Sequence, residues 1–297
     1  MLIQQLLNGL IVGSVYALFA LGFTLVFGVL NILNLAHGAV FMWGAFVGLY
    51  AVTAAGLPLP VAFLLGTVAA GVLSVLIDLL VFRPMRKRNS DEFGALVASL
   101  GANLVLISLA QQVSNARIMS FPFGTFPIVI YEFLGLRISL LQITMVLCLI
   151  VLVSALLYYV YITPFGRQVR AVAVSDRTAV LLGINPTAVY VRTFFIAGAL
   201  AGAAGVIIGL AFNSVQFLMG EPMMLRAFVV IILGGMGSIR GAIVAGLLLG
   251  VVHTLVVTYL SSQLSDAIIF AILFVALLVR PTGLFRGLRQ PARVARS

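Results

Sequence analysis

The chain has 297 residues, of which 63 % are hydrophobic and only 8 % are charged, and its formal net charge is +10. No water-soluble domain of this size can bury so much apolar surface in one core, so the composition excludes a soluble globular protein. The basic residues gather in clusters between apolar runs, which argues against a nucleic-acid-binding surface and is typical of the cytoplasmic loops of membrane proteins.

Apolar runs of about one bilayer length recur from the start of the chain. The first 77 residues contain no Asp, Glu, Lys or Arg, whereas one membrane span needs only ~20 apolar residues. The runs cover residues 6–29, 35–54, 60–82, 93–113, 139–162, 193–212 and 265–279. We predict an all-α, polytopic membrane helix bundle of about eight spans, forming one transmembrane domain over residues 1–297.

A break in the apolar pattern near the start carries the first candidate site residues. The run that ends at Gly28 is followed by Asn31, Asn34 and His37-Gly38 before another apolar segment begins. Polar groups inside a membrane are costly unless they face a cavity or a partner. We therefore expect this break to line a solute path, with hydrogen bonding between helices as the alternative.

The basic segment 163–190 reads as two short helices in a cytoplasmic loop. Thr163 and Pro164 form a helix start, Arg167 and Arg170 lie on a short amphipathic stretch, and Gly183 offers a left-handed stop. A loop of this length with defined structure is usually functional. We predict that it docks on another protein, with adsorption to anionic lipid as the alternative.

A second break lies near the end of the chain, at the glycine-rich segment 234–241. It contains Ser238 and Arg240 and is followed by another glycine-bearing apolar run. Interruptions in two repeated halves are a pointer to a transport site near the membrane midplane. Ser238 and Arg240 therefore join the predicted solute path, and a basic cytoplasmic tail follows at 281–297.

The sequence contains no motif for catalysis or metal binding that we can recognise. The only lysine, Lys87, lies between two arginines and not in a phosphate-binding loop, and the two histidines lack the spacing of a zinc hydrolase. We expect no enzymatic activity, no metal and no cofactor of its own.

Three segments together resemble the permease family of branched-chain amino acid ABC importers, over nearly the whole chain. They are LGFTLVFG at 21–28 leading to NLAHG at 34–38, TPFGR at 163–167 with AVLLGIN at 179–185, and GGMGS at 234–238. The chain departs from the family's pattern at Ala39, where several relatives carry an acidic residue, and at Arg240, where relatives often have proline.

The resemblance implies a set of partners in a bacterial cytoplasmic (inner) membrane. These are a second permease subunit, two subunits that bind ATP, and an extracytoplasmic solute-binding protein. It also implies that the 163–190 loop couples to the ATPases, through the residues Pro164, Phe165, Gly166, Arg167, Arg170, Asp176, Ala179 and Gly183.

Glu221 and Arg226 are expected to dock the binding protein or to be simply solvated, with contact to the ammonium and carboxylate of an amino acid as the alternative. The cargo stays open between a branched-chain amino acid, urea or a short amide, and an aromatic acid. The alternative mechanism is a proton-coupled secondary transporter that acts alone, in which Asp78, Glu221 or Asp266 would relay protons.

Overall fold

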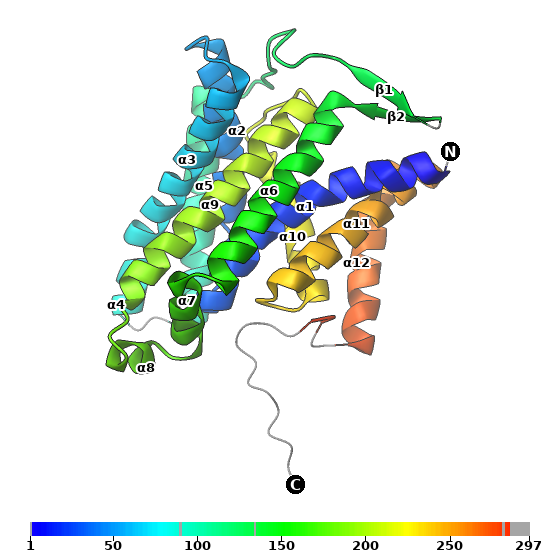
Figure 1. The fold of residues 1–297 in the computed structure, drawn as a ribbon. Helices are drawn as coiled ribbons and strands as arrows, with labels where there is room; N and C mark the ends of the chain where they lie inside the picture. The colour runs from blue at the N-terminus through cyan, green and yellow to red at the C-terminus, as the bar shows by residue number, and fades with distance from the viewer. Residues whose placement is uncertain (1, 89–90, 134, 281–282, 286–297) are drawn as a thin grey trace.

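The computed structural model describes residues 2–88, 91–133, 135–280 and 283–285. In this part of the chain, seven helices are long and apolar enough to cross a membrane. They are α1 (Leu2–Leu30), α3 (Leu59–Ile77) continued through η1 (Asp78–Phe82) and α4 (Arg83–Lys87), α5 (Glu92–Val113), α6 (Leu140–Tyr161), α9 (Pro186–Ala211), α11 (Ile239–Tyr259) and α12 (Ser262–Val279). The predicted all-α membrane bundle is confirmed (Figure 1).

Four shorter helices complete the bundle, and they occur in two pairs. Helices α2 (His37–Thr53) and α10 (Gly220–Gly234) lie inside it, and α7 (Pro164–Val174) and α8 (Asp176–Leu181) form the predicted basic loop at one end (Figure 1). An antiparallel hairpin of β1 (Ile130–Phe133) and β2 (Leu136–Ser139), which the sequence did not predict, lies at the opposite end (Figure 1).

The basic segments fix which end of the bundle is cytoplasmic. Helices α4, α7 and α8 lie at one end, and the hairpin lies at the other with the start of α1 (Figure 1). There the Gln4 side chain exchanges two hydrogen bonds, of 2.8 and 2.9 Å, with the backbone of Arg137. Because arginine-rich loops remain on the cytoplasmic side, the start of α1 and the hairpin are extracytoplasmic.

Small residues let the central helices approach one another closely. Gly13 of α1 packs against the backbone of α11, where a Cβ would lie 2.8 Å from the Leu247 Cα, and Gly44 of α2 packs against Gly202 of α9. Most of the large side chains at the centre, among them Phe19, Phe41 and Phe46, are fully buried. Such contacts replace the hydrophobic driving force that is absent between helices in lipid.

Helices α2 and α10 both begin inside the membrane, and their first residues touch. A Cβ added at Gly38 would lie 2.9 Å from the carbonyl oxygen of Gly220, and one added at Gly220 would overlap the carbonyl of Gly38. Gly38 lies about 18 Å below Tyr50, at 1.5 Å per residue, and Tyr50 donates to the Val113 carbonyl at the outer end of α5. The meeting point is therefore near the middle of a ~30 Å hydrocarbon layer.

From this point the two short helices run in opposite directions, α2 outward and α10 toward the cytoplasm (Figure 1). Each follows a long span and an irregular connection, residues 31–36 after α1 and 212–219 after α9. The two halves are thus inverted repeats in which α1 and α2 correspond to α9 and α10. Inverted repeats with broken helices at their interface are a common architecture of transporters.

The predicted break at 234–241 exists, but it lies at the cytoplasmic end of the bundle. Gly235 and Gly237 have φ angles of +98° and +76°, which only glycine adopts readily, and they separate α10 from α11. The interruption inside the membrane is the start of α10 instead. Its signal in the sequence was Pro222, because proline favours the first turn of a helix.

Candidate functional site

The polar residues of the first break shape the start of α2. Asn31 has a φ angle of +58° and donates to Glu92 at 2.6 Å, and the Asn34 side chain accepts from the Ala36 amide at 3.1 Å. His37 is fully buried, with Nε2 3.3 Å from the carbonyl oxygen of Phe19. These contacts hold the irregular connection 31–36 in place.

The polar residues of the second break lie apart from the first. Ser238 caps α11 by accepting from the Gly241 amide at 3.1 Å. The Arg240 guanidinium lies 5.4 Å from the ring centre of Tyr161, the last residue of α6 on the cytoplasmic side. The structure therefore does not bring Ser238 and Arg240 together with Asn34 and His37.

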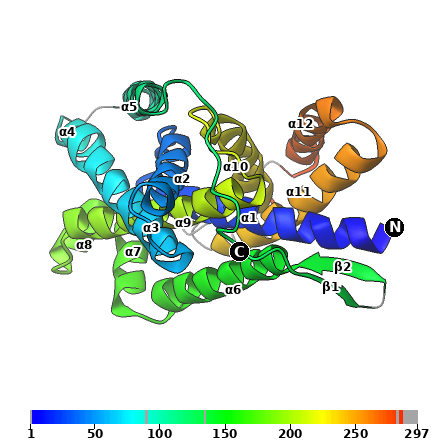
Figure 2. The same ribbon diagram turned by 90° about the horizontal axis from the view of Figure 1, so that it is seen from above.

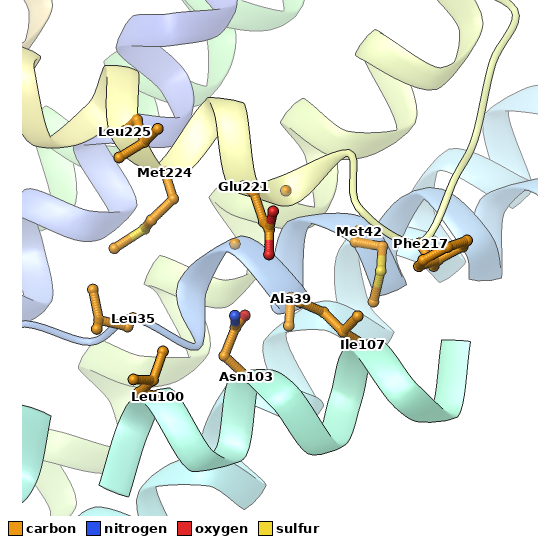
Figure 3. Close-up of a pocket in the computed structure, with 12 residues that line it drawn as sticks. Leu35, Ala39, Met42, Leu100, Asn103, Ile107, Phe217, Glu221, Met224 and Leu225 are labelled. Atoms are coloured by element: carbon orange, nitrogen blue, oxygen red, sulfur yellow. The ribbon is translucent and has the colours of Figure 1, made fainter. Parts of the chain in front are cut away.

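A cavity of about 290 Å³ lies where α2 and α10 meet, and α5 forms its third wall (Figure 3). Of the residues predicted for the solute path, only Gly38 lines it. Its apolar lining includes Met42, Ile107 and Met224, and its polar side chains are Asn103 and Glu221. Figure 3 shows these last two pointing into the same space from α5 and α10.

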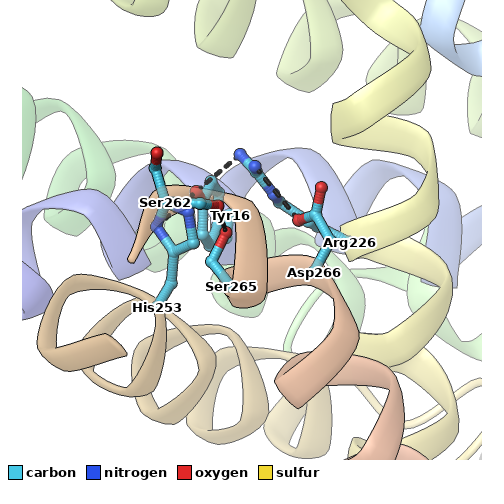
Figure 4. A network of polar contacts seen from close by, with 6 residues as sticks. All are labelled: Tyr16, Arg226, His253, Ser262, Ser265 and Asp266. Carbon is cyan, nitrogen blue, oxygen red and sulfur yellow. Dashed lines mark hydrogen bonds and ion pairs between the residues drawn. The ribbon is translucent and has the colours of Figure 1, made fainter. Parts of the chain in front are cut away.

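Glu221 and Arg226 belong to different environments although they share one helix. Glu221 lines the cavity, whereas Arg226 donates to the Tyr16 hydroxyl at 2.8 Å and pairs with Asp266 at 3.4 Å (Figure 4). The Tyr16 hydroxyl also lies 3.2 Å from Nδ1 of His253. This polar network joins α1, α10, α11 and α12. Within it, Tyr16 and Asp266 are the hydrogen-bond and ion-pair partners of the Arg226 guanidinium.

The predicted coupling loop is anchored to the bundle by part of its residues. The Phe165 ring stacks 4.6 Å from the ring of Tyr159, and Arg170 donates to the Val160 carbonyl at 2.7 Å. Gly166 lies against the same carbonyl with no room for a side chain, and Ala179 is buried. Pro164, Arg167 and Gly183 are exposed.

A chain of charged and aromatic side chains connects this loop to the spans. Asp176 of α8 accepts from the Tyr190 hydroxyl at 2.5 Å, and the Arg86 guanidinium lies 4.4 Å from the centre of the Tyr190 ring. Arg86 also pairs at 2.7 Å with Asp78, whose side chain is fully buried in the π-helical turn η1. These contacts connect α8 to the inner end of the α3 span.

The outward side of the same loop is apolar. Val180, Leu181 and Leu182 are 56 %, 86 % and 69 % exposed, beside Val174 at the end of α7. We call these four residues the docking knob. None of these four residues is among those that the resemblance implied for coupling; of Ala179 and Gly183, which are, the first is buried and the second is exposed.

One family model matches most of this chain, and several known proteins are similar to it. The family described as branched-chain amino acid transport system / permease component matches residues 5–277. The high-affinity branched-chain amino acid transport system permease protein BraD of Pseudomonas aeruginosa is 32 % identical over 95 % of this chain and 95 % of its own length.

Two further relatives carry similar names. LivH of Escherichia coli (strain K12), a permease protein of the high-affinity branched-chain amino acid transport system, is 32 % identical over 95 % of this chain and 94 % of its own. The probable branched-chain amino acid transport permease protein LivH of Methanocaldococcus jannaschii is 28 % identical over 82 % of this chain and 78 % of its own.

Proposed function

This chain belongs to the family of permease components of branched-chain amino acid transport systems, and on that premise we propose that it moves a branched-chain amino acid through the bacterial cytoplasmic (inner) membrane as one permease subunit of an ABC importer. The observation that carries the proposal is the cavity at the midplane, where two broken helices of inverted repeats meet. Solute sites of transporters with inverted repeats lie at such points.

The energy source in this proposal is a pair of partner ATPases, which bind the ATP. The docking knob gives them an apolar contact on the cytoplasmic side, and Arg167 and Arg177 are exposed in the same loop. Closure of the ATPases would move α8, and the chain from Asp176 through Tyr190 and Arg86 to Asp78 would pass that movement to α3.

A second permease subunit is proposed to cover the face formed by α5, α10 and α12, which lie along one side of the molecule (Figure 2). Leu100, Glu221 and Leu225 are exposed on this face at the mouth of the cavity. A charge at the centre of the bilayer costs about 3 kcal/mol even on the lowest scale. A face that carries Glu221 at this depth is better covered by protein and a solute path than by lipid.

The proton-coupled alternative is less well supported by the same contacts. A relay through Asp78, Glu221 and Asp266 needs acids that are free to exchange protons, but Asp78 pairs with Arg86 and Asp266 pairs with Arg226. Both of these carboxylates are therefore held in ion pairs with arginines in this structure. Of the three acids, only Glu221 is not in an ion pair, and a proton relay needs more than one acid.

The test is to purify the chain together with the products of its neighbouring genes and to measure ATP hydrolysis. We expect hydrolysis to be stimulated by the solute-binding protein loaded with leucine, isoleucine or valine, and not by the empty binding protein. Absence of any ATPase in the purified assembly, or stimulation by urea or an aromatic acid in place of the amino acids, would contradict the proposal.

A further inference from the structure

We propose that Glu221 binds the ammonium group of the cargo during its passage, and that the cavity between α2, α5 and α10 is a subsite for a small solute that carries both a positive charge and a short aliphatic group. The inference rests on the proposed function, because it concerns the same path. It adds the residue that distinguishes an amino acid from the urea and aromatic-acid cargoes.

The depth of the Glu221 carboxylate in the membrane follows from the residues around it. Asn103, which faces the same cavity, lies about 15 Å from the outer end of α5 and about 17 Å from its inner end, at 1.5 Å per residue. Glu221 follows Gly220, whose backbone touches Gly38 at the same level. Glu221 is therefore close to the membrane midplane, where an ionisable side chain is a functional candidate by default.

Among the described residues, Glu221 is the one acid whose side chain has no hydrogen-bond or ion-pair partner. The chain has seven Asp and Glu residues. Six of them have a hydrogen bond or an ion pair: Asp78 with Arg86, Asp91 with the Gly94 amide, Glu92 with Asn31, Glu132 with Arg137, Asp176 with Tyr190 and Asp266 with Arg226. Within the described residues, the Glu221 carboxylate has neither.

The first turns of two helices lie beside Glu221, and no described basic side chain pairs with it. Glu221 is in the first turn of α10, and the first turn of α2 lies beside it. The positive ends of two helices stabilise a nearby carboxylate. Arg226, the nearest basic residue along α10, is held by Tyr16 and Asp266. The negative charge is thus available to a cation that enters the cavity.

The remaining walls define the rest of the solute. The Asn103 amide can donate to a carboxylate, and Met42, Leu100 and Ile107 offer an apolar surface for a short side chain (Figure 3). An aromatic acid without an amine would be repelled by Glu221. Urea is neutral and would leave the carboxylate without an ionic partner, which is costly in a low-dielectric site.

Measuring both uptake and ATP hydrolysis shows whether Glu221 contacts the solute in the path or contacts the binding protein. In vesicles that contain the complete assembly, Glu221→Gln is expected to reduce amino acid uptake per ATP hydrolysed by about tenfold or more, the loss typical of a charge-assisted hydrogen bond. Stimulation of the ATPase by the loaded binding protein is expected to remain within about twofold of the wild type. Glu221→Asp should retain most of the uptake.

The matched control is Glu132→Gln, which also removes one carboxylate but lies in the exposed hairpin, paired with Arg137. Unchanged uptake per ATP in Glu221→Gln would overturn the inference. A parallel loss of ATPase stimulation in this variant would overturn it too, because that result assigns Glu221 to contact with the binding protein.

A second measurement does not require transport. Leu100 lines the cavity and is exposed at its mouth, and Cys148 on α6 is the single native cysteine. In the assembly carrying Leu100→Cys and Cys148→Ser, a cationic methanethiosulfonate should react faster than an anionic one. Adding Glu221→Gln should lower that ratio of rates severalfold, because removing the carboxylate makes the electrostatic potential in the cavity less negative.

An unchanged ratio of rates would refute a free carboxylate in the cavity. Because this ratio is measured without cargo, it can support or refute the electrostatic claim even if the assembly transports no amino acid. Failure of the proposed function is seen separately, as wild-type vesicles that take up no branched-chain amino acid under any condition.

Discussion

At the scale of single residues, the contact between Gly38 and Gly220 determines whether the two broken helices can meet. Each glycine occupies a position where a side chain would strike the backbone of the other helix. The sequence shows both glycines, but in a chain with 29 of them nothing marks this pair. Their role follows only from the tertiary arrangement.

Gly220→Ala is expected to destabilise the assembly by about 1–3 kcal/mol, because the added methyl group forces α2 and α10 apart. Thermal unfolding of the purified protein in detergent should show a lower midpoint, with reduced uptake. The matched control is Gly101→Ala in α5, where the space around the glycine is open. Equal midpoints for the two variants would contradict the close contact.

The buried pair of Asp78 and Arg86 is a second feature at this scale. The Asp78 side chain is fully buried, whereas Arg86 is partly exposed and reaches it from the next helical turns. From the sequence, Asp78 was named only as a proton-relay residue of the alternative mechanism. The π-helical turn η1, which starts at Asp78, is what brings the two side chains together, and no local sequence signal predicts it.

Asp78→Ala should leave a buried guanidinium without its partner, and breaking such a pair costs about 3–5 kcal/mol. Thermal unfolding measures the loss. Glu132→Ala removes an exposed pair with Arg137 and should change stability by less than about 1 kcal/mol. Comparable losses in both variants would show that the Asp78 pair contributes no more than a surface pair.

At the scale of elements, the 163–190 loop could be predicted well and its contact face could not. Helix punctuation at Thr163, Pro164, Ser175 and Gly183 is enough to place α7 and α8. Which side faces outward depends on packing against α6 and α9, through Phe165 and Tyr190. Short helices with mixed faces do not reveal this from their periodicity.

Leu181→Asp is expected to remove the ATPases from the purified assembly, because a charge would enter the apolar contact of the docking knob. The measurement is the amount of ATPase subunit that copurifies with the tagged permease. Phe123→Asp is the control, since Phe123 is 98 % exposed on the extracytoplasmic connection. Full retention of the ATPases by Leu181→Asp would contradict the docking assignment.

At the scale of the whole molecule, composition and charge clusters give the bundle and its sidedness. The inverted repeat could be recognised only partly from the sequence. The interruption at 212–219, which precedes α10, contains no charged residue and no glycine cluster before Gly220. The predicted tail at 281–297 lies almost wholly outside the described residues, so its expected cytoplasmic position stays a prediction.

Sidedness can be tested directly by cysteine labelling in intact cells, in a Cys148→Ser background. We expect a membrane-impermeant thiol reagent to label Ile128→Cys in the outer connection and not Arg177→Cys in the basic loop, until the membrane is permeabilised. Both positions are exposed, so access to the reagent decides the result. Labelling of Arg177→Cys in intact cells would place the loop on the wrong side for an ATPase.

The central claim is that an external ATPase drives a solute through a bundle that has no energy source of its own. The most direct measurement is leucine uptake into proteoliposomes that contain the complete assembly and loaded binding protein. We predict uptake that requires ATP on the cytoplasmic side and continues after the proton gradient is collapsed. Uptake by this chain alone, driven by a proton gradient without ATP, would contradict the account.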